Sequence, residues 1–231
     1  MAGPRSRGAF LAAWLIVTVG GARGQDPSTA YPDPGRLAAE VAAFAAADSL
    51  APPPTGAVVC VGSSSMRFWH DTIAADLAPL TVVPRGFGGS TMFDLLHFAQ
   101  PLVLACRPRV ILLYEGDNDI DFGVAPAEVR ATFDRFVGVV RAVLPETRIQ
   151  VIAIKPSPAR WARWPAMQEG NRLLAEACAA DSLLGFIDVA TPMLGDDGRP
   201  RPELFLPDSL HLNERGYALW TAIIRPALAG G

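Results

Sequence analysis

The sequence predicts a doubly wound α/β domain, a three-layer α/β/α sandwich around a mostly parallel five-stranded sheet. Three observations lead to this fold class. The chain has 231 residues, a length at which α/β folds usually remain one domain. Half of the residues are hydrophobic and 19% are charged, which is an ordinary globular composition. Short apolar runs alternate with longer amphipathic segments, as strands and helices do in parallel sheets.

Five short apolar runs are the predicted strands. They lack polar alternation, which is typical of strands buried on both faces of a parallel sheet. These runs are 57–61, 80–83, 109–114, 149–154 and 183–189. Between and around them lie the predicted helices, 36–50, 90–105, 126–144, 164–181 and 213–229. Ligands of such folds bind beyond the carboxyl ends of the strands, so functional residues are expected there.

The first residues have the order of a secretory signal peptide. Arg5 and Arg7 precede an apolar run at 9–19, and small residues follow at 22–24. The apolar run is shorter than the roughly 20 residues that a transmembrane helix needs. We therefore expect a signal peptide at 1–24, a Pro-rich tether at 25–35 and one domain at 36–231. The mature protein would be secreted or periplasmic and would not span the membrane.

Charge and cysteine content exclude several classes of protein. The formal net charge is −3, the wrong sign for a protein that follows nucleic-acid phosphates. Cys60, Cys106 and Cys178 lie far apart inside apolar segments and are predicted to be core residues, although one disulfide remains open. Neither a CxxC nor an HExxH spacing occurs, so no metal and no cofactor is expected.

Two polar segments follow the first two predicted strands. In the segment GSSSMR at 62–67, Ser64 lies at a turn from strand to helix, where an exposed hydroxyl can meet backbone N–H groups. The other interpretation is a serine-rich turn that only caps the helix. The segment PRGFGGST at 84–91 offers an unobstructed N–H for an oxyanion, or else a tight connection between strand and helix. It lacks the GK[ST] of a phosphate-binding loop.

Two further polar segments lie after the third strand and before the last helix. In EGDNDI at 115–120, Asn118 could donate its amide to an oxyanion, form an Asx turn or join a cation site with its acidic neighbours. In PDSLHLN at 207–213, Asp208 precedes His211 by three residues, a spacing that lets a carboxylate fix the imidazole tautomer. Half of a metal site is the alternative interpretation of this pair.

In combination these four segments resemble the SGNH (GDSL-type) hydrolase superfamily, whose four blocks carry Ser, Gly, Asn and His in this order. The resemblance covers residues 57–228 and implies a flavodoxin-like fold and a serine esterase or lipase. It implies that Ser64 is the nucleophile, with Ser65 as fallback, and that His211 is the base, oriented by Asp208. Ser64, Gly89 and Asn118 correspond to the oxyanion donors. Ser63 and Pro84 depart from the usual Asp and Asn of the family.

The expected substrate is a small-molecule or glycan ester. Among these, an acetyl ester on a carbohydrate is ranked first. A lysophospholipid or another lipid ester is the alternative within the same chemistry. A non-catalytic binding domain on the same scaffold is the alternative of another class, against which the retained Ser, Asn, Asp and His argue. Arg67 and Trp161 are weaker candidates for contact with the substrate, because such side chains also serve in packing.

Overall fold

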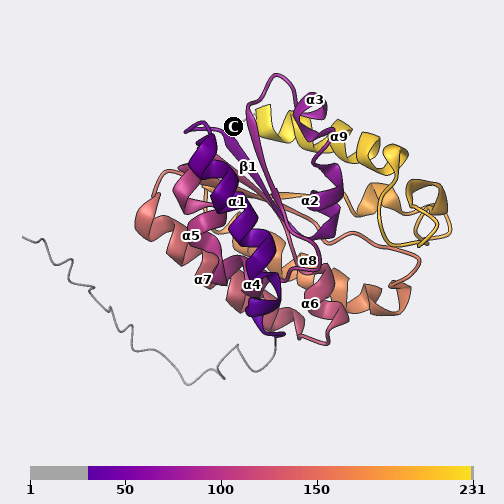
Figure 1. The fold of residues 1–231 in the computed structure, drawn as a ribbon. Helices are drawn as coiled ribbons and strands as arrows, with labels where there is room; N and C mark the ends of the chain where they lie inside the picture. The colour runs from indigo at the N-terminus through magenta and orange to yellow at the C-terminus, as the bar shows by residue number, and fades with distance from the viewer. Residues whose placement is uncertain (1–30, 230–231) are drawn as a thin grey trace, which may run out of the picture.

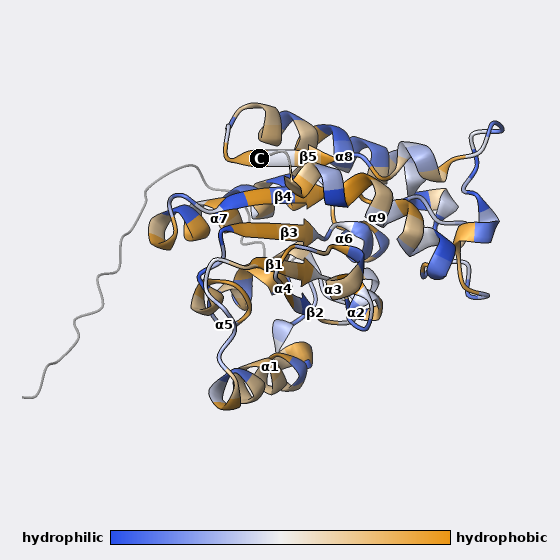
Figure 2. Cartoon of the chain, turned by 90° about the horizontal axis from the view of Figure 1, so that it is seen from above, coloured by the Kyte–Doolittle hydropathy of each residue, from blue (hydrophilic) through white to orange (hydrophobic). Residues whose placement is uncertain are grey.

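The computed structural model describes residues 31–229, and these residues form one five-stranded sheet. The strand order is β2-β1-β3-β4-β5, and all neighbouring strands are parallel. Figure 2 shows the five strands side by side, with β1, β3 and β4 coloured as hydrophobic. The strands are β1 Val58–Gly62, β2 Val82–Gly86, β3 Val110–Tyr114, β4 Arg148–Ile152 and β5 Leu184–Ile187. The predicted α/β class and parallel sheet are confirmed.

Helices cover both faces of the sheet (Figure 1). On one face lie α2 Ser64–Trp69, α3 Ile73–Asp76 and α9 Glu214–Ala229. On the other lie α1 Ala38–Leu50, α4 Met92–His97, α5 Ala99–Leu102, α7 Pro126–Val143 and α8 Trp164–Ala179, where α7 packs against α4 and α8. The short α6 Asp117–Asp121 follows β3 directly. Short 3-10 helices are η2 Pro34–Leu37, η3 Leu104–Cys106, η4 Trp161–Arg163, η5 Thr191–Met193 and η6 Pro202–Leu204.

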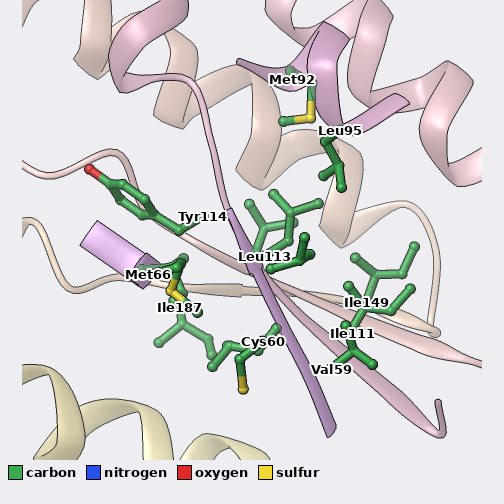
Figure 3. Packing of buried hydrophobic residues seen from close by; sticks show 14 of the residues in the cluster. Val59, Cys60, Met66, Met92, Leu95, Ile111, Leu113, Tyr114, Ile149 and Ile187 are labelled. Carbon is green, nitrogen blue, oxygen red and sulfur yellow. The ribbon is translucent and has the colours of Figure 1, made fainter. Parts of the chain in front are cut away.

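The core lies on both faces of the central strands. Every residue of β1 and β3 is buried, as the absence of polar alternation predicts. In Figure 3, Met92 and Leu95 of α4 lie on one side of the strands, and Met66 of α2 lies on the other. Cys60, Cys106 and Cys178 are buried free thiols, so the disulfide that the sequence left open does not form.

The N-terminal boundary lies earlier than the sequence suggests. The predicted signal peptide falls outside the described residues, and of the predicted tether only residues 31–35 are described. Tyr31 is buried and its hydroxyl donates to Thr132 Oγ1 of α7 over 3.4 Å. The Asp33 side chain accepts from Gly35 N over 2.8 Å and caps η2. Residues 31–35 are therefore packed against the domain. Among the described residues, no helix is both long and apolar enough to cross a membrane.

Candidate active site

The first three strands of the sheet end level with one another. Gly62, the last residue of β1, is in register with Gly86 of β2 and with Tyr114 of β3. Gly62 has φ +146°, and a Cβ atom there would lie 2.1 Å from the Tyr114 carbonyl oxygen, so only glycine fits this turn. The serine, glycine and asparagine segments therefore leave the sheet at one edge.

Ser64 and His211 meet at this edge. Ser64 is the first residue of α2, and its Oγ lies 3.0 Å from His211 Nε2. The other ring nitrogen, His211 Nδ1, lies 2.6 Å from Asp208 Oδ2. The three side chains thus form a continuous hydrogen-bonded chain from hydroxyl to carboxylate. A serine in this arrangement can pass its proton to a neutral imidazole, whose tautomer the carboxylate fixes.

Asp208 is held by its own turn. Its Oδ1 accepts from the backbone N–H groups of Leu210 and His211, over 2.9 and 3.0 Å. Slight burial opposes the effect, but hydrogen bonds from the His211 ring and from these two amides lower the pKa of Asp208 to about 2. The carboxylate is therefore ionised throughout the neutral range. Phe68, four residues after Ser64, packs edge-on against the His211 ring with centroids 4.6 Å apart.

Ser65 has a different environment. It is buried, and its carbonyl oxygen accepts from the Tyr217 hydroxyl of α9 over 2.7 Å. The hydrogen bond to His211 is made by Ser64 Oγ. The geometry therefore favours Ser64 over its fallback, and Ser65 serves to attach α2 to the last helix.

The glycine-rich loop after β2 contains three glycines in different environments. A Cβ on Gly86 would lie 2.2 Å from Arg67 N, so Gly86 allows close approach of β2 and α2. Gly88 N–H points to the Glu40 carboxylate, with both oxygens at 3.3 Å. Gly89 has φ +74°, and its N–H has no acceptor within the part of the chain that the structure describes. Gly89 N–H is thus free to bind a ligand oxygen.

Asn118 and Asp119 connect the loop after β3 to the glycine-rich loop. Asn118 Nδ2 donates one hydrogen bond to the Ser90 carbonyl oxygen over 2.8 Å, and its Oδ1 accepts from Arg160 Nη1 over 3.0 Å. Asp119 accepts from Met92 N at the start of α4 and from Gly116 N, over 2.9 and 3.0 Å. The two segments that carry Gly89 and Asn118 are therefore fixed relative to each other.

Asp117 is the centre of a buried ion network. Its Oδ2 lies 2.6 Å from Lys155 Nζ and 3.1 Å from the Tyr114 hydroxyl, and its Oδ1 lies 2.7 Å from Arg160 Nη1. Burial alone would raise the pKa of Asp117, but the charges of Lys155 and Arg160 outweigh burial and hold it at about 2. Both oxygens of this carboxylate are therefore engaged by the protein.

Glu115, directly after β3, is buried beside these groups. Its Oε1 accepts from Ser90 Oγ over 2.6 Å, while Oε2 has no partner in the described structure. Burial, together with the negative charge of Asp119, raises the pKa of Glu115 well above its usual range. Burial thus favours the protonated form of Glu115.

The two weaker sequence candidates, Arg67 and Trp161, have their contacts with residues other than Ser64 and His211. Arg67 is half-exposed, with Nε 3.6 Å from Glu40 Oε1. Trp161 stacks on Trp164 with ring centroids 6.1 Å apart, and the Arg199 guanidinium lies 5.0 Å from the Trp161 ring centroid. Neither side chain has a hydrogen bond or ring contact with Ser64 or His211 in the described structure.

A cavity of about 470 Å³ is lined by Phe68, whose ring packs against that of His211, and by Leu212, the next residue in the chain; Ser64 and His211 do not line it. Its walls combine apolar, hydroxyl and carboxylate groups from α2, α3, α9 and the segment before α9. They are Phe68, Asp71, Thr72, Asp76, Leu206, Leu212, Asn213, Glu214, Tyr217 and Ala218. The cavity therefore offers an aromatic face together with hydrogen-bond acceptors.

The ion pair between Lys155 and Asp117 was not predicted from the sequence. One signal was present, because Lys155 is the chain's sole lysine and ends the apolar run IQVIAI, where a buried cation needs a partner. Such a run does not reveal which carboxylate is the partner. Among residues 31–229, no group of three or more His, Cys, Asp or Glu side chains is arranged to hold a metal ion.

Comparisons with known proteins identify a matching family. The model of the GDSL-like lipase/acylhydrolase family matches residues 48–219. No curated protein matches the chain in sequence.

Several solved structures share the fold. One is a Streptococcus pneumonia protein named for platelet activating factor, with a TM-score of 0.75, 19% identity and coverage of 84% of this chain and 93% of that one. Another is a GDSL-like lipase from Bacteroides thetaiotaomicron, with a TM-score of 0.70, 20% identity and coverage of 83% and 98%. A third is a carbohydrate esterase family 3 protein from Talaromyces cellulolyticus, with a TM-score of 0.55, 16% identity and coverage of 75% and 97%.

The resemblance to the SGNH superfamily is thus confirmed. Since the family model covers most of the chain, this protein belongs to the GDSL-like lipase/acylhydrolase family and is a hydrolase acting on esters.

Proposed function

We propose that the protein hydrolyses a carboxylic ester with Ser64 as nucleophile, His211 as general base and Asp208 as the group that orients it. One observation carries the proposal, namely the hydrogen-bonded chain of 3.0 Å from Ser64 Oγ to His211 Nε2 and 2.6 Å from His211 Nδ1 to Asp208. A serine hydroxyl is a weak nucleophile at neutral pH, and a neighbouring base removes this obstacle.

The reaction proceeds in two steps. Ser64 Oγ attacks the ester carbonyl carbon as its proton passes to His211 Nε2, and the tetrahedral intermediate collapses when the imidazolium returns this proton to the leaving alcohol. Water then attacks the acyl-enzyme, with His211 again taking and returning the proton. The products are an alcohol, a carboxylic acid and regenerated Ser64. Asp208 stays ionised and stabilises the imidazolium in both steps.

The proposed oxyanion hole consists of the backbone N–H groups of Ser64 and Gly89 and the side-chain amide of Asn118. The Ser64 amide is at the first position of α2, where a helix offers no internal acceptor. The Gly89 amide has no acceptor in the described structure, and one Asn118 amide hydrogen remains after the bond to Ser90. Each such donor contributes about 3–4 kcal/mol to transition-state stabilisation.

We propose an acetyl ester on a carbohydrate as the substrate. The cavity lined by Phe68 and Leu212 is the candidate site for the leaving alcohol, and it pairs the Phe68 ring with the carboxylates of Asp71, Asp76 and Glu214. Aromatic faces and acidic acceptors suit sugar rings and hydroxyl groups, whereas the negative lining opposes a phosphate-bearing alcohol.

We also propose that the protein is exported, as the basic, apolar and small-residue order of residues 5–24 predicts. This feature precedes the described residues.

The experiment compares ester substrates and two serine variants. Residues 25–231 are assayed on p-nitrophenyl acetate, on longer p-nitrophenyl esters, on an acetylated xylo-oligosaccharide and on lysophosphatidylcholine. Ser64→Ala should lower kcat by roughly 10⁴–10⁶. Ser65→Ala is the matched control and should keep kcat near the wild-type value. A fluorophosphonate probe should label Ser64, as read by peptide mass spectrometry.

Full activity of the Ser64→Ala protein, or a label on Ser65, would overturn the nucleophile assignment. Preference for lysophosphatidylcholine over the acetylated sugar would keep the mechanism and replace the substrate class with a lipid ester.

A further inference from the structure

The loop at 155–160, which follows β4, contacts two of the segments that carry the proposed machinery. Ala159 N donates to the Ser209 carbonyl oxygen over 3.0 Å, within the turn that joins Asp208 to His211. The next residue, Arg160, donates to Asn118 Oδ1. One loop therefore bonds to both the turn of the base and the side chain of the proposed oxyanion donor.

The Arg160 guanidinium is held by three acceptors. Nη1 donates to Asp117 Oδ1 over 2.7 Å and to Asn118 Oδ1 over 3.0 Å, and Nη2 lies 3.1 Å from Asp121 Oδ2. The side chain is only 15% exposed. Asp117 is itself fixed by Lys155 on its other oxygen, so the guanidinium has little freedom to move.

This contact determines which way the Asn118 amide faces. An amide has one acceptor oxygen and one donor NH₂ group, and the flipped orientation would set NH₂ against the guanidinium donors. With Oδ1 on Arg160, Nδ2 must face away from it, toward the Ser90 carbonyl oxygen. One amide hydrogen then remains for a substrate oxygen, and the neighbouring positive charge polarises the amide further.

We propose that Arg160 is a positioning residue of the oxyanion hole, which fixes the Asn118 side-chain amide in its donating orientation. The proposal rests on the proposed function, in which Asn118 binds the oxyanion. It predicts that Arg160 affects kcat only when the Asn118 side chain is present. A purely structural ion pair, or direct binding of substrate by the guanidinium, would not have this property.

The test is a double-mutant cycle between Arg160→Ala and Asn118→Ala, assayed on p-nitrophenyl acetate and normalised to the folded fraction. Asn118→Ala should lower kcat by about 10²–10³ with little change in KM. Arg160→Ala should lower kcat by about 10–10², also with little change in KM. The double variant should be within about threefold of Asn118→Ala alone, because the target of Arg160 is already absent.

Matched controls accompany the cycle. Arg163→Ala removes a neighbouring arginine that is also near Asp121, at 3.8 Å, and should leave kcat unchanged. If Arg160→Ala does not fold, Arg160→Lys takes its place in the cycle, since lysine keeps the cation and loses the planar fork. Free guanidinium added to Arg160→Ala should restore part of the kcat.

Three outcomes would overturn the proposal. The first is a double variant whose loss of kcat equals the product of the two single losses, which would show that the two residues act independently. The second is a rise in KM at unchanged kcat in Arg160→Ala. The third is wild-type kcat in Asn118→Ala. Ser64→Ala is assayed in parallel. If that variant is inactive while the cycle shows no coupling, the inference fails and the proposed function stands; if that variant is fully active, the proposed function itself fails.

Discussion

At the scale of single residues, the imidazole of His211 contacts three side chains, one at each ring nitrogen and one against the ring. Ser64 lies on Nε2, Asp208 on Nδ1, and Phe68 covers the ring edge-on. The Asp208 carboxylate is partly exposed, so its stabilisation of an imidazolium is screened by solvent. The hydrogen bond fixes the tautomer without such screening. We therefore expect Asp208 to matter more for orientation than for charge.

Asp208→Asn tests this balance. A neutral amide can hydrogen-bond either imidazole tautomer, so we expect kcat to fall by about 10²–10⁴. In the wild type, kcat/KM should rise from acid to neutral pH, in the range where histidine side chains lose their proton. The measurement is kcat/KM from pH 4.5 to 9.5 for both proteins.

A wild-type profile that is flat from pH 5 to 8 would rule out His211 as the base. Wild-type kcat in Asp208→Asn would show that the carboxylate is not needed to orient the ring.

At the scale of elements, the site depends on how closely β2 approaches α2. Gly86 N donates to His70 Nε2 over 2.8 Å just after α2, and a Cβ on Gly86 would lie 2.4 Å from the Met66 carbonyl carbon. Burial and the charge of Arg67 lower the pKa of His70 to about 4, so this acceptor stays neutral at neutral pH. The position of Ser64 at the other end of this short helix thus depends on a glycine in a neighbouring strand.

Gly86→Ala should therefore disturb both stability and catalysis. The added methyl group must displace α2, which overpacks the interior and should cost about 1–3 kcal/mol of unfolding free energy. Activity per folded molecule should fall too, because Ser64 moves with the helix. Gly88→Ala is the matched control, since a Cβ there meets nothing within 4 Å, and it should resemble wild type. Urea unfolding and initial rates measure both effects. Normal activity of folded Gly86→Ala would show that α2 adjusts without moving Ser64.

Much of this element order is predictable from the sequence, because buried strands and long amphipathic helices have clear patterns. The strand predicted at 109–114 is β3 Val110–Tyr114, and the helix predicted at 126–144 is α7 Pro126–Val143. The helix predicted at 90–105 is instead divided into α4, α5 and η3. The helices α3 and α6 were not predicted, and the helix after Ser64 was expected without bounds, because four to six residues are too few to show a helical period.

The site was less completely predictable. The order Ser, Gly, Asn and Asp-x-x-His supplied the candidates, since each follows a strand or precedes the last helix. Spacing between Asp208 and His211 is local and therefore visible in the sequence. Contacts such as that between Arg160 and Asn118 join residues 42 positions apart, and no local pattern encodes them.

At the scale of the whole molecule, buried acidic groups make stability depend on pH. Glu115, Asp94, Asp117 and Asp119 are all buried. Asp94 is paired with Arg36, and Asp117 with Lys155 and Arg160, whereas Glu115 has no cationic partner in the described structure and burial raises its pKa. A carboxyl group whose folded-state pKa is raised binds its proton more tightly when folded. Its contribution to stability is complete below the pKa of an unfolded glutamate and is lost as pH rises toward the folded value.

Glu115→Gln should remove this dependence. Between the pKa of an unfolded glutamate and the raised pKa of the folded Glu115, the folded protein keeps a proton that the unfolded chain has released, so wild-type unfolding free energy should fall with rising pH by up to about 1.4 kcal/mol per pH unit from this group. Glutamine mimics the neutral acid at every pH. Relative to wild type, the variant should therefore gain stability between pH 5.5 and 8.5, as measured by urea unfolding. Exposed Glu146→Gln is the control. Parallel curves for wild type and Glu115→Gln would mean that Glu115 is ionised in the folded protein.

The hydrogen bond between Ser64 and His211 closes a loop of 147 residues, and that between Tyr217 and Ser65 spans 152. A growing polypeptide makes the nucleophile's turn early, but it has no base until the segment before α9 has been synthesised. Closing a loop of this size costs conformational entropy, and that cost grows only slowly with loop length. Hydrolytic competence therefore waits for the C-terminal segment to be synthesised. A protease that cleaves between β5 and Asp208 and releases the C-terminal segment would remove the base together with the buried core residues Trp220 and Ile224 of α9.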